Sequence, residues 1–107
     1  MKKDFILNQI SWVTLVERNY HFDPAPVYDS FWGFNHFAQL NGLTTRIIFK
    51  SKAELTEESN IKRSDLTDQG YEFYKMCYDK YCDGVIDRGK SAMDYKLLEK
   101  YLKKLKS

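Results

Sequence analysis

The sequence predicts a single α+β domain over residues 1–107, mostly helical, with about four helices and one β-hairpin. Four stretches place apolar residues at helical spacing, and two shorter stretches between them are rich in β-branched residues. With 107 residues, of which 43% are hydrophobic and 16% aromatic, the chain is long enough to bury one core of its own. The order helix, helix, hairpin, helix, helix is also winged-helix-like.

The first two elements are expected to be helices. Residues 5–18 follow Asp4 with apolar groups at helical spacing, although their β-branched content leaves a strand open. The second helix has clearer boundaries, because Asp23 suits the N-cap position and Pro24 the first helical position. Gly42 is expected to end this helix at the C′ position.

The periodicity then changes to that of strands. Residues 43–50 are rich in β-branched side chains, and a polar loop leads from them to a short second strand at residues 60–64. A β-hairpin is the simplest way to join these two strands.

Two further helices are expected in the C-terminal half. Thr67 suits the N-cap of the first, whose tyrosines at 71, 74, 78 and 81 fall on one face. Glycines and aspartates then predict a turn over residues 84–89. Ser91 and Asp94 have the spacing of a capping box, so we expect the last helix to begin there, with its lysines outside.

Composition also limits the cellular compartment of the protein and the metals or cofactors that it could bind. No apolar run approaches the roughly 18 residues of a membrane span, and the start lacks the apolar region of a signal peptide. We therefore expect a cytoplasmic protein with no membrane partner. Cys77 and Cys82 would lie about 140° apart around a helix, too far round to form a disulfide. Two cysteines alone make no zinc site, and we expect neither a metal nor a cofactor.

Charge is unevenly distributed along the chain. The formal net charge is +2, but residues 90–107 alone carry six lysines against two carboxylates. Residues 20–42 contain seven aromatic side chains and two aspartates, with no lysine or arginine. A mildly acidic body with a basic tail is therefore expected.

No catalytic motif stands out. The sequence has no glycine-rich phosphate loop, no GxSxG, no HExxH and no CxxC. His21 and His36 are the only histidines, and a general base at His36, oriented by Asp29 or Asp23, is a minor alternative. We expect no enzymatic activity and no small-molecule substrate.

The winged-helix order makes a DNA-binding transcriptional regulator the alternative function. A DNA reader must neutralise phosphates, yet the helix in the reading position, residues 24–41, carries an aspartate and no basic residue. The expected wing region carries Glu54, Glu57 and Glu58. Five basic residues argue the other way, so we do not expect nucleic acid as the partner but keep the alternative: Arg46, Lys50, Lys52, Lys62 and Arg63.

A protein-binding face is the functional interpretation that the 20–42 stretch favours. Tyr28, Trp32 and His36 follow one another at spacings of four residues, with Asp29 and Gln39 beside them, and form a partly aromatic, mildly acidic strip. Tyrosine and tryptophan anchor protein interfaces, and an acidic rim steers a basic partner. The alternative is that another helix covers the strip. The residues expected to bind a partner are Asp23, Tyr28, Asp29, Trp32, His36, Glu54, Glu57 and Glu58.

Three segments resemble small bacterial immunity proteins of contact-dependent growth inhibition and related polymorphic toxin systems. They are NGLTTRIIF at 41–49, SDLTDQGYEFYKMCYDKYCDGVIDRG at 64–89 and LLEKYLKKL at 97–105. The resemblance implies a cytoplasmic protein without catalysis of its own, which binds one cognate toxin domain, often a nuclease, and blocks its active site or substrate surface. The LTDQG element at 66–70 also looks like the strand-to-helix junction of winged-helix regulators.

The net positive charge departs from what the resemblance implies. An inhibitor of a basic nuclease is expected to imitate the negative charge of nucleic acid. With a net charge of +2, either the acidic face is local or the toxin is not a nuclease.

Overall fold

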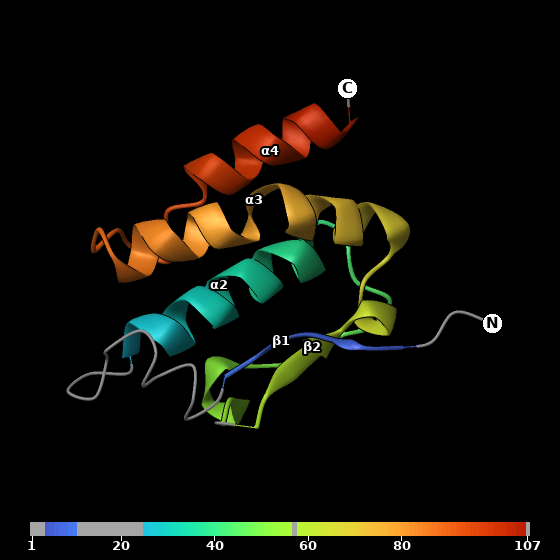
Figure 1. Cartoon of the computed structure of the whole chain (residues 1–107), viewed down its shortest axis with the longest axis horizontal. Helices are drawn as coiled ribbons and strands as arrows, with labels where there is room; N and C mark the ends of the chain where they lie inside the picture. Colours follow the sequence, from blue (N-terminus) through green and yellow to red (C-terminus); the bar gives the residue numbers. More distant parts are fainter. Residues whose placement is uncertain (1–3, 11–24, 57, 107) are drawn as a thin grey trace.

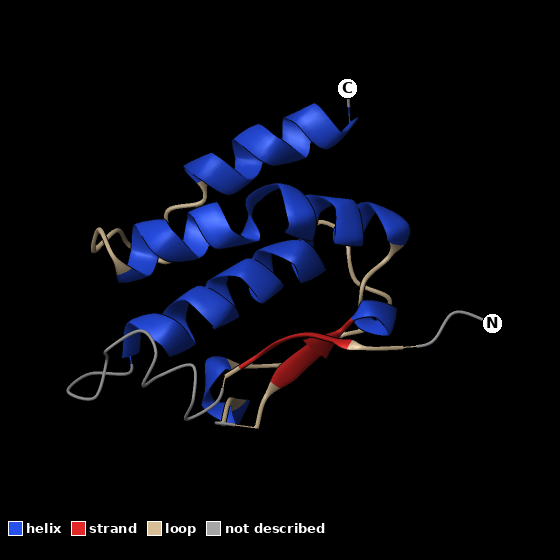
Figure 2. Cartoon of the chain, in the orientation of Figure 1, coloured by secondary structure: helices blue, strands red, loops and turns tan. Residues whose placement is uncertain are grey.

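The computed structural model describes residues 4–10, 25–56 and 58–106 (Figure 1). Helix α3 lies between α2 and α4, and a two-stranded antiparallel sheet packs on the α2 side (Figures 1 and 2). The α+β class is confirmed, with three α-helices in the described ranges rather than about four. The elements in chain order are β1 Ile6–Gln9, α2 Ala25–Leu40, a 3-10 helix Lys52–Glu54, β2 Asn60–Lys62, a second 3-10 helix Arg63–Asp65, α3 Asp68–Ile86 and α4 Lys96–Lys106.

Helix α2 ends where its glycine predicts. Gly42 has a φ of 69°, a left-handed conformation that glycine adopts without steric cost. The Leu43 N–H donates to the Ala38 carbonyl at 2.9 Å, and the Gly42 N–H reaches the Gln39 carbonyl at 3.4 Å, as in a Schellman motif. The predicted end of this helix is confirmed, whereas its predicted start at Asp23 and Pro24 lies outside the described residues.

Helix α3 begins at its predicted cap. The Thr67 side-chain oxygen accepts a hydrogen bond from the Gly70 N–H at 3.0 Å. Tyr78 and Tyr81 are buried and Tyr74 is partly buried against α2, so the predicted tyrosine face is the packed face. The α2–α3 contact therefore follows from spacing that is visible in the sequence.

The larger core cluster lies between the three helices and is mostly aromatic. Phe34 of α2 has no exposed surface, and its ring lies 5.5 Å from that of Phe73 and 4.9 Å from that of Tyr78. Burial of each such ring contributes about 1.5–3 kcal/mol. A smaller cluster joins α2 to the sheet through Ile10, Phe31, Ile61 and Leu66.

The predicted hairpin between residues 43–50 and 60–64 is wrong. Strand β2 pairs instead with β1, in the register Ile6 to Lys62, Asn8 to Ile61 and Gln9 to Asn60. The helix expected from residue 5 onward is therefore a strand over Ile6–Gln9, and residues 11–24 lie outside the described ranges.

Residues 43–50 form a single bridge, Thr44 with Leu66, and no strand. A side chain explains the difference. The Gln39 amide oxygen accepts hydrogen bonds from the Ile48 and Phe49 N–H groups, at 2.8 and 3.0 Å, and its NH₂ donates to the Phe49 carbonyl. These bonds hold the segment on α2 and occupy backbone groups that a strand would pair.

Helix α4 begins later than predicted. Ser91 belongs to a turn, where its hydroxyl accepts from the Met93 N–H at 3.1 Å. Asp94 accepts from the Lys96 N–H at 3.1 Å, and the helix starts at Lys96, so the predicted capping box is not formed. The inner face is as expected, because Leu98 is fully buried against α3.

Replacement of Gly70 by alanine tests how closely α3 approaches the chain after α2. A Cβ at Gly70 would collide with the backbone carbonyl of Leu43, so we expect Gly70→Ala to lower the free energy of unfolding by about 1–3 kcal/mol. Gly84→Ala is the matched control in the same helix. Its Cβ would meet only the flexible Lys90 side chain at 3.4 Å, and helix propensity favours alanine by up to about 1 kcal/mol. Denaturant unfolding of both variants measures the difference, and equal effects would contradict the close approach.

Candidate functional site

Three of the predicted binding residues lie along one side of α2. Tyr28, Trp32 and His36 are all half-buried, and the Trp32 and His36 rings stack with centroids 4.9 Å apart. Tyr28 also packs against the smaller core cluster. No described helix covers Trp32 or His36 completely, so both rings keep part of their surface exposed.

Trp32 also borders an open hollow of about 510 Å³, here called the Trp32 groove. The groove lies between the first half of α2 and the connection from α3 to α4. Met93 on that connection is 65% exposed and adds apolar surface to the groove. The residues that line the groove are Pro26, Asp29, Trp32, Lys52, Val85, Gly89, Lys90, Ser91, Ala92 and Met93.

The wall of the groove opposite Trp32 is held in place from the core. The Tyr81 hydroxyl donates a hydrogen bond to the Ala92 carbonyl at 2.6 Å. Gly33 makes this possible, because a Cβ there would collide with both the Tyr81 hydroxyl and the Ala92 carbonyl. The sequence alone does not assign the α3–α4 connection to the site, because a glycine next to Trp32 does not indicate which residues pack against it.

The groove has positive charges that residues 20–42, the stretch containing Trp32, do not supply. Asp29 forms an ion pair with Lys52, which comes from the 3-10 helix Lys52–Glu54 packed against α2. Lys90 lines the same groove from the α3–α4 connection. The stretch that lacks cations in the sequence therefore has two lysines beside it in space.

The predicted glutamates are less closely associated with the strip. The Glu54 carboxylate accepts from the Lys50 and Ser51 N–H groups at 2.9 and 3.2 Å, so it caps its own 3-10 helix. Glu58 is exposed, and neither of these two glutamates lines the Trp32 groove. Asp23 and Glu57 lie outside the described residues. Of the predicted set, Asp29 and Trp32 share the groove.

The structure does not form the His36–Asp29 pair that the general-base alternative requires if Asp29 is the orienting carboxylate. Within the described ranges no carboxylate lies within ion-pair distance of His36, which contacts the Trp32 ring instead. Among the same residues no group of three or more His, Cys, Asp or Glu side chains is placed to hold a metal ion.

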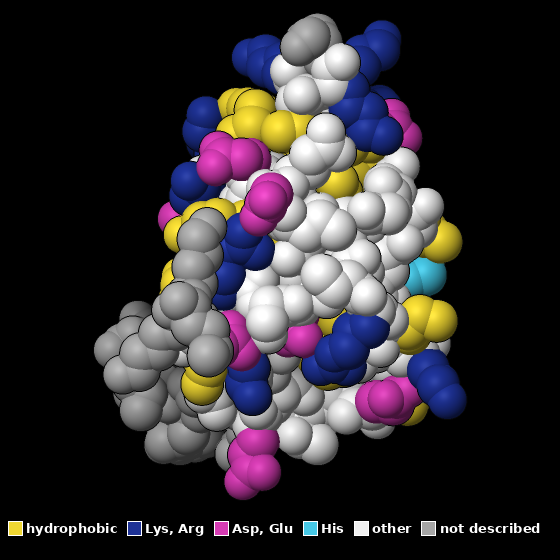
Figure 3. All heavy atoms as spheres, turned by 90° about the vertical axis from the view of Figure 1, so that its right-hand side faces the viewer, with side chains coloured by type: hydrophobic (Ala, Val, Ile, Leu, Met, Phe, Trp, Pro, Cys, Tyr) yellow, Lys and Arg dark blue, Asp and Glu magenta, His cyan; other side chains and the backbone are white. Residues whose placement is uncertain are grey.

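The basic residues that argued for DNA binding are partly neutralised. Arg46 pairs with the buried Asp65 at 2.9 Å, and Arg63 pairs with Asp68 at 2.5 Å. On the face shown in Figure 3, Lys and Arg side chains are interspersed with Asp and Glu from the top of the view to the bottom. The described helices include none that is both long enough and apolar enough to cross a bilayer.

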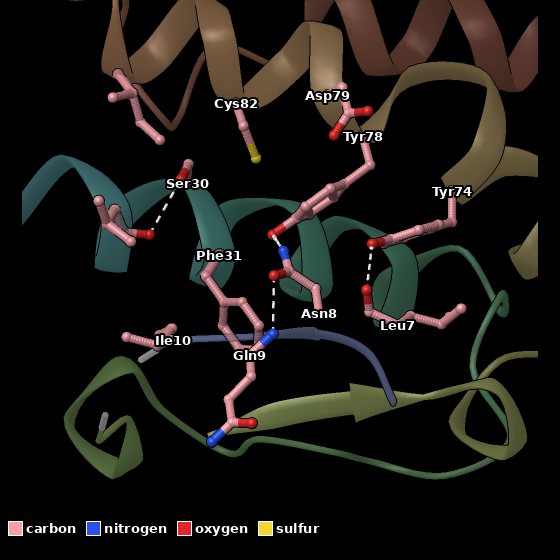
Figure 4. A pocket seen from close by; sticks show the side chains of 12 residues that line it. Leu7, Asn8, Gln9, Ile10, Ser30, Phe31, Tyr74, Tyr78, Asp79 and Cys82 are labelled. Atoms are coloured by element: carbon pink, nitrogen blue, oxygen red, sulfur yellow. Dashed lines mark hydrogen bonds between the residues drawn. The ribbon is translucent and has the colours of Figure 1, made fainter. Parts of the chain in front are cut away.

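A smaller hollow of about 200 Å³ lies between β1, α2 and α3 (Figure 4). Asn8 donates its side-chain N–H to the Tyr78 hydroxyl, and the Tyr74 hydroxyl donates to the Leu7 carbonyl at 3.1 Å. Cys82 points into this hollow beside Tyr78. Burial raises the pKa of Tyr78 well above its ordinary value of 10.0. These polar contacts tie the sheet to α3.

Both cysteines are reduced and buried, as expected from their spacing. The Cys77 thiol donates to the Phe73 carbonyl at 3.3 Å. Burial, the largest cause, raises the pKa of this thiol to about 12, so the reactive thiolate form is suppressed at neutral pH.

Comparisons of the chain with known proteins add no family. No protein-family description, no curated protein and no solved structure matches it. The resemblance to immunity proteins therefore depends on the sequence segments alone, and the functional argument depends on the geometry of the Trp32 groove.

The buried tyrosines make stability fall at alkaline pH. Burial raises the pKa of Tyr74, Tyr78 and Tyr81 above the ordinary 10.0, so the folded chain holds protons that the unfolded chain releases. The contribution is complete below pH 10.0 and is lost as pH rises through the folded values. We expect phenolate absorbance from these residues to appear together with loss of the helical circular dichroism signal.

Tyr101 provides an internal contrast in the same titration. A hydrogen bond from Lys80 lowers its pKa, so its phenolate should appear first and without loss of helix. A Tyr78→Phe variant should show a shallower decline of unfolding free energy above pH 10.0. Full ionisation of every tyrosine with the helical signal intact would contradict the described burial.

Proposed function

We propose that this chain is a non-enzymatic binding protein of the immunity type, which binds a cognate toxin domain and neutralises it by covering the active site or substrate surface. The observation that carries the proposal is the Trp32 groove, where a half-buried indole borders an open hollow of about 510 Å³. The exposed Met93 lies at the same hollow. The proposal implies a cytoplasmic site of action, where a toxin delivered into the cell would be met.

The composition of the groove suits protein docking. Tryptophan, tyrosine and methionine are enriched at the centres of protein interfaces, and polar residues form the rim. Here Trp32, Ala92 and Met93 supply the apolar surface, and the Asp29–Lys52 ion pair lies beside them. The Tyr81 hydrogen bond to Ala92 fixes one wall, and a preformed site loses less conformational entropy on binding.

The winged-helix alternative receives less support. A wing requires residues 43–50 to pair with β2, and Gln39 holds that segment on α2 instead. The lack of a paired wing favours the protein-binding proposal over DNA reading.

The proposal is tested by co-expression with the protein encoded immediately upstream, because immunity genes usually follow their toxin gene. We expect a complex that co-elutes in size-exclusion chromatography. Trp32→Ala should weaken it by at least about thirtyfold, as expected for a buried aromatic anchor worth about 2 kcal/mol. Ile47→Ala, at a side chain that is 68% exposed and does not line the groove, is the control and should leave affinity unchanged.

The thermal stability of Trp32→Ala decides between interface and core. Because Trp32 is only half-buried, its melting temperature should stay close to that of the unchanged chain. A large loss of stability would assign Trp32 to the core. Unchanged affinity with unchanged stability would remove the groove from the interface, and salt-dependent binding to random DNA would favour the regulator alternative.

A further inference from the structure

A second hollow, of about 160 Å³, adjoins the Trp32 groove at the junction of α3 and α4. Val85, Lys90 and Ser91 line both hollows, so the two lie next to each other. This second hollow, here called the cationic hollow, has four positively charged side chains and one carboxylate: Lys80, Arg88, Lys90, Lys96 and Asp94.

The positive charge of the cationic hollow is largely uncompensated. In the part of the chain that the structure describes, no carboxylate lies within ion-pair distance of Arg88, Lys90 or Lys96. Lys80 donates to the Tyr101 hydroxyl at 2.8 Å, which leaves its charge in place. Asp94 accepts from the Lys96 backbone N–H. Four cations against one carboxylate attract an anionic group.

Lys90 is the residue that connects the two hollows. Its backbone N–H donates to the Gly84 carbonyl at 3.0 Å, which fixes where its side chain begins. Its side chain passes over Gly84, since a Cβ there would lie 3.4 Å from the Lys90 Cδ. Because Lys90 also lines the Trp32 groove, an anion bound at Lys90 would lie at the border of that groove.

We propose that the partner of the Trp32 groove presents an acidic segment, with an apolar side chain against Trp32 and neighbouring carboxylates in the cationic hollow. This inference depends on the proposed function, and it reverses the charge expected of the partner. The sequence favoured a basic partner steered by Asp29, whereas Asp29 is paired with Lys52 and the adjoining surface is positive.

A nucleic-acid backbone is the main competing occupant, because lysines continue from Lys96 along α4. Two features favour carboxylates of a protein. The cationic hollow adjoins apolar surface that a phosphodiester chain would leave uncovered, and one face of the Trp32 ring is already stacked on His36.

The test uses three synthetic peptides that share one leucine and carry a run of glutamate, glutamine or lysine. Binding to the full chain is followed at low ionic strength by backbone amide NMR shifts. The glutamate peptide should shift the amides of Val85, Arg88 and Lys90 and the Trp32 indole N–H. Binding of the glutamine peptide should be at least about tenfold weaker, and the lysine peptide should not bind.

Charge reversal localises the site. The double variant Arg88→Glu/Lys90→Glu should weaken binding of the glutamate peptide by at least about tenfold. Lys75→Glu, on α3, is the control, since Lys75 is exposed, lines neither hollow and pairs with Glu72 at 2.9 Å. Circular dichroism of each variant verifies that it is folded. Equal binding of the glutamate and glutamine peptides, or equal effects of the two variants, would overturn the inference.

Three further measurements separate this inference from competing outcomes. A single-stranded oligonucleotide of equal charge that binds more tightly than the glutamate peptide would overturn the acidic-protein assignment in favour of nucleic acid.

Trp32→Ala should reduce glutamate-peptide binding only in part, because the cations remain. The proposed function fails, and the inferred anionic site stands, if Trp32→Ala leaves the affinity for the co-expressed partner unchanged while Arg88→Glu/Lys90→Glu still weakens binding of the glutamate peptide. If Trp32→Ala weakens binding of the partner but Arg88→Glu/Lys90→Glu does not, the inference of an acidic segment fails and the proposed function stands.

Discussion

Packing of Phe34 against the aromatic rings of α3 is the contact on which the rest of the structure depends. Phe34 has no exposed surface and contacts Phe73 and Tyr78 at centroid distances of 5.5 and 4.9 Å. The glycine beside it, Gly33, lets α2 and α3 approach closely enough for Tyr81 to reach the Ala92 carbonyl. That hydrogen bond fixes the α3–α4 connection, and the connection forms one wall of the Trp32 groove. The core and the candidate site are therefore parts of one arrangement.

The features of the fold that the sequence predicts are those set by local interactions. The cap at Thr67 and the C′ glycine at Gly42 act over three to five residues, and the helices begin and end at them as expected. Strand pairing is different, because β1 and β2 lie more than 50 residues apart and both are short. The β-branched segment 43–50 predicted a strand by composition, yet three hydrogen bonds from the Gln39 side chain decide its conformation. Nothing in the local sequence indicates such a partner.

The same distinction explains which part of the candidate site was predictable. Helical spacing separates Phe31 and Phe34, which are buried, from Trp32 and His36, which are not, so the aromatic side of the strip could be predicted. The opposite wall of the groove could not be predicted, because its position depends on the packing of Tyr81 and Ala92 against Gly33 of α2. Glu54 illustrates a further limit: its acidity suggested a steering charge, but two backbone N–H groups engage its carboxylate.

Charge is the property that changes most between the sequence and the folded chain. Residues 20–42 carry no cation, but Lys52 pairs with Asp29 and Lys90 lines the same groove. The strength with which such charges act on a ligand depends on their distance in space and on the local dielectric, and not on their separation along the chain. The field that a partner meets is therefore set by the α3–α4 junction as much as by α2. Because the positive excess there lies beside an apolar groove, the surface favours a partner that offers both a hydrophobic side chain and carboxylates, which an acidic protein segment provides.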